Sequence, residues 1–260
     1  MGENKMLKII VSKTADLLAK LYDMFNAPNT YENLPVHVLS INGLSETFYY
    51  GYVFDKENLW DKLFDVLINK QQDNMVKHYL SLLDKINIYN WKLIEKELEV
   101  FSGKFKETYS SYRSKINKFL GKILRINKFF KEEYMILSFN PFKELIGAVP
   151  RINIDLEYAV ITLFVRPDSN PLKALDLYLH ELIHGLLRLN NIRIREDVEE
   201  EFIDTLCPEG YLSKELGLSN TVNVNEGNLQ AYIASYFEEK LYEKIDLLSY
   251  LERRGSVHYI

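Results

Sequence analysis

The sequence predicts an α+β fold that is mainly helical and carries one small mixed sheet. Apolar residues recur at helical spacing from residue 56 to 130 and again after residue 170. Between these regions lie short runs rich in β-branched and aromatic residues, the pattern typical of strands. The chain has 260 residues, 47% hydrophobic and 27% charged, which is enough apolar material for a core. We expect three parts: an N-terminal α/β segment at 1–55 that can join the later sheet, a helical module at 56–130, and a C-terminal domain at 131–260.

The N-terminal half alternates between the two patterns. Residues 7–11 fit either a strand or the start of a helix that continues to Phe25. Two short strands are predicted at 35–39 and 47–54. Helices follow, and a long amphipathic run begins after Gly103.

The C-terminal half combines three strands with three helices. Strands are predicted at 134–139, at the alternating positions Ile152, Ile154 and Leu156, and at 158–165, whose nearly continuous apolar run indicates burial on both faces. Asn170 followed by Pro171 is a typical helix start, and Asn190-Asn191 ends this helix. Two further helices are expected, one at 196–207 and one that opens at 225–227 and runs towards Leu251.

The charge, the cysteine count and the apolar stretches of the sequence argue against several classes of function. The net charge of −5 argues against nucleic acid as the main partner of the whole surface. The single cysteine, Cys207, cannot form an internal disulfide, and we expect it to be buried. No apolar stretch is long enough for a membrane span, and the first residues lack the pattern of a secretion signal, so we expect a cytoplasmic protein.

The outer face of the long amphipathic run forms a basic stripe, and no acidic residue lies between 113 and 131. Such a stripe is usually a solvated helix face, although it can also bind phosphates or an anionic surface. It consists of Arg113, Lys115, Lys118, Lys122, Arg125, Lys128 and Lys131.

The helix that begins at Pro171 contains His180-Glu181-Leu182-Ile183-His184. In a helix the two histidines lie at i and i+4, with Cβ atoms about 5–6 Å apart, so both rings can reach one metal ion. Glu181 lies one step round the helix, where a general base can touch a water molecule held in an open metal position. A single buried histidine is more often a core residue, but this full pattern arises by chance in only roughly one in a hundred chains of this composition.

On these residues the sequence resembles the zincin metallopeptidases, specifically the glutamate-liganded gluzincins. In several gluzincin families the third zinc ligand lies in a Glu-x-x-x-Asp pattern on the next helix, and Glu200 to Asp204 fit that pattern. The resemblance therefore implies Zn²⁺ bound by His180, His184 and Glu200, with Asp204 orienting a ligand histidine. It covers about residues 134–240 and implies a zincin-like domain within 131–260.

Other carboxylates compete for the third-ligand position. Glu199 and Glu201 flank Glu200, and Asn225-Glu226-Gly227 is similar to a zinc aminopeptidase motif, although Glu226 lies farther from His184 than in those enzymes. His37, His78 and His258 lie outside the helices that flank the motif, so a third histidine ligand is not expected.

The implied activity is zinc-dependent hydrolysis of a peptide or protein substrate. Zinc lowers the pKa of its water towards 7, and Glu181 takes the proton and passes it to the leaving amine. Tyr232 and Tyr236 are candidate donors to the oxyanion. The alternative is a regulatory or scaffold protein that binds nucleic acid or protein through its basic stripe and carries a vestigial or structural metal site.

Overall fold

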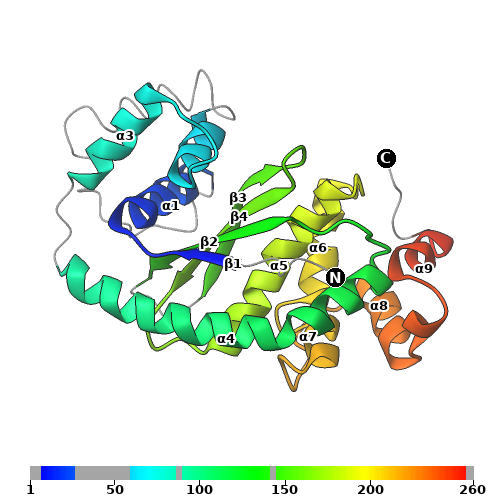
Figure 1. The fold of residues 1–260 in the computed structure, drawn as a ribbon. Coiled ribbons are helices and arrows are strands. Elements are labelled where there is room, and N and C mark those ends of the chain that lie inside the picture. The colour runs from blue at the N-terminus through cyan, green and yellow to red at the C-terminus, as the bar shows by residue number, and fades with distance from the viewer. Residues whose placement is uncertain (1–6, 27–58, 86–89, 141–144, 256–260) are drawn as a thin grey trace. The chain divides into compact units, whose positions relative to one another are not determined.

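The computed structural model describes residues 7–26, 59–85, 90–140 and 145–255 (Figure 1). The chain divides into two compact units. The first unit comprises residues 1–102, 132–152 and 159–167, and the second comprises 103–131, 153–158 and 168–260. The predicted strands at 35–39 and 47–54 lie outside the described residues. The three-part division of the chain stays a prediction, and the compact units do not follow its boundaries.

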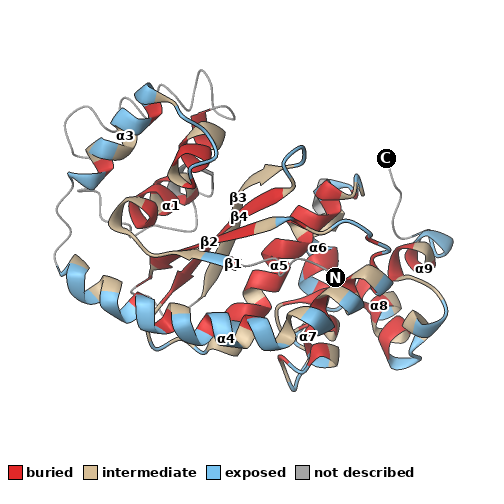
Figure 2. Cartoon of the chain, in the orientation of Figure 1, coloured by how far each residue is buried: buried red, intermediate tan, exposed pale blue. Residues whose placement is uncertain are grey.

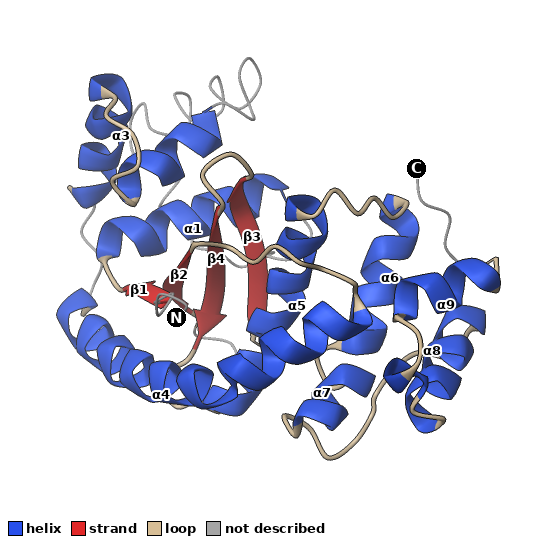
Figure 3. Ribbon diagram, turned by 45° about the vertical axis from the view of Figure 1, so that its right-hand side comes forward, coloured by secondary structure: helices blue, strands red, loops and turns tan. Residues whose placement is uncertain are grey.

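A four-stranded sheet lies at the centre of the first unit, in the order β1-β2-β4-β3 (Figure 3). β1 (Leu7–Ile10) runs parallel to β2 (Glu132–Phe139). Backbone hydrogen bonds join the residues before β2 and β4 (Tyr158–Val165), Lys131 N to Glu157 O at 2.7 Å, and their far ends, Asn140 N to Val165 O at 2.9 Å. These pairs align the two strands in parallel. β3 (Ile146–Asn153) is at the edge, and its short connection to β4 requires an antiparallel pair.

The sheet confirms part of the strand predictions. All eight residues of β4 are buried (Figure 2), as the continuous apolar run at 158–165 indicates. The strand at 134–139 is present as β2. Of the two possibilities for residues 7–11, the strand is the observed one.

The predicted strand through Ile152, Ile154 and Leu156 is wrong in its position. β3 ends at Asn153, and Ile154 and Leu156 lie in the turn before β4, where they are 49% and 56% exposed. The Asn153 side chain accepts a hydrogen bond from Leu156 N at 2.9 Å, and Glu157 has a φ of 53°. This local turn chemistry overrides the apolar alternation.

Helices complete the first unit. α1 (Lys13–Asn26) contacts both β2 and α3 (Asn74–Asp84), and residues 59–67 are also helical. The buried carboxylate of Asp16 fixes α1 to the end of β2, because it accepts hydrogen bonds from Ser138 Oγ at 2.7 Å and Phe139 N at 2.8 Å.

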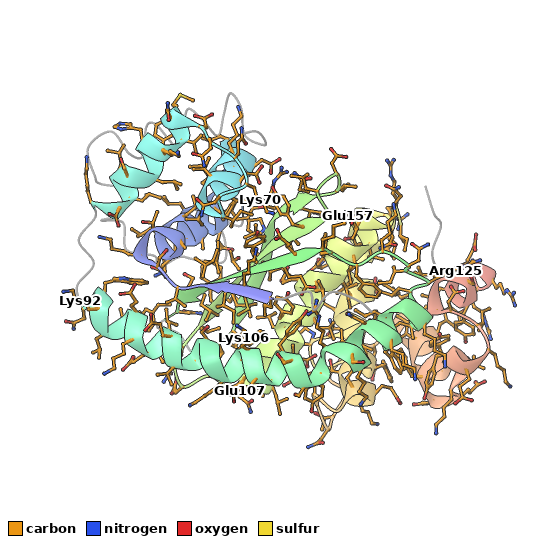
Figure 4. The ribbon with its side chains drawn as sticks, viewed as in Figure 1. Lys70, Lys92, Lys106, Glu107, Arg125 and Glu157 are labelled. Atoms are coloured by element: carbon orange, nitrogen blue, oxygen red, sulfur yellow. The ribbon has the colours of Figure 1, made fainter. Side chains whose placement is uncertain are left out.

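α4 (Trp91–Ile123) is a single helix of 33 residues that continues through Gly103, where the sequence suggested a new run. Its buried face carries Phe105 and Tyr109, whereas residues such as Lys106 and Glu107 are exposed (Figure 4). A glycine inside a helix costs only about 1 kcal/mol. Burial of the aromatic face exceeds that cost.

Several side chains of the basic stripe make contacts inside the second unit. Lys115 Nζ donates to Glu215 O at 3.0 Å and to Leu216 O at 2.7 Å. Lys122 lies over the ring of Tyr242, at 5.2 Å from its centroid. Only part of the basic stripe is a helix face, because α4 ends at Ile123 and the last three basic residues lie beyond it. These residues are Arg125, Lys128 and Lys131.

The helix predicted to contain both histidines is confirmed as α5 (Pro171–Leu189). The Asn170 side chain accepts a hydrogen bond from Leu172 N at 2.9 Å, and Pro171 occupies the first turn. Apolar residues on most sides bury the helix, which Figure 2 shows in red. Phe105 and Tyr109 of α4 pack edge-on against the ring of Tyr178.

The rest of the second unit is mostly helical, with α6 (Glu196–Leu206), α7 (Tyr211–Leu216), α8 (Asn228–Glu238), the 3-10 helix η2 (Leu241–Glu243) and α9 (Leu247–Arg253). α6 packs against α5, α7 and α8, and α8 packs against α9. The single long C-terminal helix that the sequence predicted is wrong: the chain breaks at Lys240, with φ 53°, and restarts at Asp246, which caps α9.

Candidate metal centre

His180 and His184 lie on one face of α5, and their ring centroids are 5.0 Å apart. Both side chains are largely buried, with exposed fractions of 8% and 13%. α6 packs against this part of the second unit and carries the acidic run Glu199 to Asp204. Among the described residues, one group of His, Cys, Asp and Glu side chains has the spacing of a metal site, and it consists of His180, His184 and Glu200.

The three candidate ligands converge through specific atoms. The two Nε2 atoms are 3.2 Å apart. Glu200 Oε1 lies 3.3 Å from His180 Nε2, and Glu200 Oε2 lies 3.1 Å from His184 Nε2. Tetrahedral zinc with bonds of about 2.0–2.1 Å needs ligand atoms about 3.3 Å apart. The spacing of these atoms is close to that value, with each carboxylate oxygen of Glu200 next to a different ring, so the three side chains could hold a zinc ion.

The opposite nitrogen of each ring faces a hydrogen-bond acceptor. His180 Nδ1 is 2.9 Å from the carbonyl oxygen of Cys207, and His184 Nδ1 is 2.7 Å from Glu199 Oε1. Because each acceptor requires an N–H donor, each neutral ring carries its proton on Nδ1 and turns the Nε2 lone pair towards Glu200. Three electron-pair donors then face one point, an arrangement that a cation stabilises.

Charges around this point shift several pKa values. Hydrogen bonds from His180 and His184 lower the pKa of Glu200 well below its usual range. Burial alone lowers the pKa of His184, but its hydrogen bonds to Glu199 and Glu200 outweigh burial and raise the pKa to about 9. In the metal-free protein a proton therefore competes for this site.

Glu181 is also buried, at 8% exposure, beside this cluster. Burial raises the pKa of its carboxyl group, and the two histidines oppose that shift. A carboxylate with a raised pKa is a stronger proton acceptor near neutral pH than an exposed one.

The other predicted carboxylates take different places. Glu199 lies on the Nδ1 side of His184, so it does not face the Nε2 atoms. Glu201 accepts a hydrogen bond from Gln230 Nε2 at 2.7 Å, and Glu226 is exposed in the segment before α8. Asp204 Oδ1 is 3.5 Å from His180 Nδ1, farther than the Cys207 carbonyl.

Sequence reasoning missed two partners of the histidines. The Cys207 carbonyl has no signature in the sequence, because any residue at that position supplies the same group. The sequence suggested Glu199 only as a metal ligand. In the structure Glu199 of α6 instead reaches the Nδ1 side of the His184 ring. Cys207 itself is buried as predicted, and burial raises the pKa of its thiol.

Tyr236, a predicted oxyanion donor, has a structural role. It is fully buried, and its hydroxyl donates to Ile245 O at 2.8 Å. Tyr232 is partly exposed and lies beneath the guanidinium of Arg254.

Comparison with family models, curated proteins and solved structures finds no match.

Proposed function

We propose that this protein is a zinc-dependent peptide-bond hydrolase of the gluzincin type. The observation that supports this most directly is the spacing of 3.1–3.3 Å among the two Nε2 atoms and the Glu200 oxygens. Acceptors behind both rings, the Cys207 carbonyl and Glu199, favour the proton on Nδ1, so each ring, once neutral, offers Nε2 as its metal-binding atom.

Each residue of the centre has a defined role in this proposal. His180, His184 and Glu200 hold the ion, and Glu199 and the Cys207 carbonyl orient the two rings. When bound, zinc lowers the pKa of a water molecule towards 7 and polarises the substrate carbonyl. Glu181 accepts the proton of the attacking water and delivers it to the leaving amine nitrogen.

Metal analysis of four variants tests the proposal. The wild type should bind one zinc per chain, and His180→Ala and His184→Ala should lose it. Glu181→Gln should keep the zinc but cleave an unfolded casein substrate about 10²- to 10⁴-fold more slowly. Glu226→Ala is the matched control, because Glu226 is exposed and lies outside the cluster. Zinc-free wild type, or full activity of Glu181→Gln, contradicts the proposal.

The alternative, a binding protein that acts through the basic stripe, has weaker support. Lys115 and Lys122 make internal contacts, and Lys131 pairs with Glu157 at 3.0 Å, so these groups already have partners within the fold. Nucleic-acid binding that weakens steeply with salt, without peptidase activity, would favour this alternative.

The predicted location also belongs to the proposal. None of the described helices is both long enough and apolar enough to cross a membrane. We place the enzyme in the cytoplasm, because its single cysteine is buried and forms no internal disulfide, as is usual in a reducing compartment.

A further inference from the structure

One face of α5 presents a polar residue at each of four successive turns. Lys173, Asp176, His180 and His184 follow one another at intervals of three or four residues, so they lie along one stripe. Each of these side chains forms a hydrogen bond or an ion pair with a group of α6 or of residues 207–213, the segment that follows α6. The histidines hold Cys207 O and Glu199, and Lys173 Nζ pairs with Glu209 Oε1 at 3.0 Å.

Asp176 is the buried centre of this stripe, with an exposed fraction of 2%. Its two oxygens have different partners: Oδ2 accepts a hydrogen bond from Glu209 N at 2.8 Å, and Oδ1 accepts one from Ser213 Oγ at 2.5 Å. The carboxylate thus bridges α5 to Glu209, which lies between α6 and α7, and to Ser213 in the first turn of α7.

The segment has little freedom between its two ends. At its start, Cys207 N donates to Ile203 O of α6 at 2.8 Å. At Gly210 the chain passes so close to α6 that a Cβ atom would lie 2.4 Å from Thr205 O. Asp176 holds the residue between them, Glu209, through its backbone N–H. The chain is therefore held on both sides of the Cys207 carbonyl, by Cys207 N before it and by Glu209 N after it, and this keeps the carbonyl against α5.

We propose that Asp176 is a positioning residue for the metal centre. By holding the segment from Cys207 to Ser213 against α5, it keeps the Cys207 carbonyl at His180 Nδ1, which fixes the tautomer and the ring plane of His180. The inference deepens the proposed function, because it assumes that His180 Nε2 binds the metal.

The chemistry at Asp176 favours this role over simple packing. Burying a carboxylate is costly unless charged hydrogen bonds compensate it. Elsewhere on α5 the buried positions Leu175 and Leu179 carry apolar side chains, which fill the core without that cost. A carboxylate here is explained by the two donors of the adjoining segment.

Asp176→Asn is the informative variant, because its amide has the same shape but can accept from only one of the two donors. In the variant we expect about 10- to 100-fold weaker zinc binding, measured by competition with a chromogenic chelator. Nitrogen-15 NMR of the metal-free protein should show His180 protonated on Nδ1 in the wild type and divided between two tautomers in Asp176→Asn. Ser213→Ala removes one donor only, and we expect a smaller loss of affinity with the same spectral change.

Asp16→Asn is the matched control. Asp16 is also buried and accepts hydrogen bonds from a serine hydroxyl and a backbone N–H, but in the first unit. The Asp16→Asn substitution should destabilise the protein without changing its zinc affinity or the NMR signals of His180. If Asp16→Asn weakens zinc binding as strongly as Asp176→Asn, the effect is one of general stability and the inference is overturned.

The two readouts separate this inference from the proposed function. Zinc binding that is equal in wild type, Asp176→Asn and Ser213→Ala, with unchanged His180 signals, overturns the positioning role and leaves the hydrolase proposal standing. A wild type that binds no zinc, but whose His180 tautomer is lost in Asp176→Asn, overturns the proposed function and supports the positioning of the ring.

Discussion

Replacing Glu199 by alanine should weaken zinc binding although Glu199 does not face the metal position. Its Oε1 accepts the Nδ1 proton of His184 at 2.7 Å, and the two side chains are only 16% and 13% exposed. The variant leaves that N–H without its charged acceptor. His184 can then rotate or move its proton to Nε2, the atom that binds the ion in the proposed function.

The size of the effect follows from this contact. A hydrogen bond to a charged group in a partly buried site contributes about 1.5–3 kcal/mol. Loss of an acceptor behind a metal-binding histidine costs about 10- to 100-fold in affinity, which corresponds to about 1.4–2.8 kcal/mol. Competition titration with a chromogenic chelator at fixed pH and ionic strength measures this change directly.

Glu201→Ala is the matched control for this experiment. It removes the same charge from the same helix, but Glu201 bonds to Gln230 and not to a histidine. We expect its zinc affinity to stay within about threefold of wild type, since a charge near the surface is screened. Equal losses in both variants would attribute the effect to net charge, and no loss in Glu199→Ala would refute the reasoning.

Three further predictions address the third ligand, a buried acid and the core. Glu200→Ala should reduce zinc affinity at least about 100-fold, by equilibrium dialysis, whereas full retention would show that Glu200 is not a ligand. Asp23 is 5% exposed, its Oδ2 has no hydrogen-bond partner among the described residues, and burial raises its pKa from 3.8 to about 6. The folded state therefore binds this proton more tightly than the unfolded chain, so stability falls as pH rises from about 4 to 6. Asp23→Asn should flatten that fall and raise the unfolding free energy at pH 7 by up to about 3 kcal/mol in urea titrations; a slope unchanged by the substitution contradicts this. Phe105→Ala should lower the unfolding free energy by about 3–5 kcal/mol, against less than about 0.5 kcal/mol for the exposed Leu93→Ala, and equal effects would refute the burial argument.

The sequence predicted the elements whose signals are local. The Asn170-Pro171 start and the apolar spacing of α5 are sufficient for a helix, and the helix geometry alone brings His180 and His184 together. The continuous apolar run of β4 likewise predicts a strand buried on both faces. These features depend on residues within a few positions of one another, so one sequence contains them.

Features that depend on competition between local and distant interactions were predicted less well. β3 lies earlier in the chain than the alternation at 152–156 suggested, because the turn through Asn153 and Glu157 fixes the register. α4 continues through Gly103 because burial of residues such as Phe105 compensates the weak helix propensity of glycine.

The sequence by itself determined that this chain carries two histidines one helical turn apart, a glutamate beside them and a run of acidic residues on the next helix. It did not determine which carboxylate faces which ring atom. The packing of α6 on α5 decided that, since it turns Glu200 towards both Nε2 atoms and Glu199 towards His184 Nδ1. Neighbours on a helix point about 100° apart, so adjacent identical residues acquire different chemistry only when a second element fixes the direction each one faces.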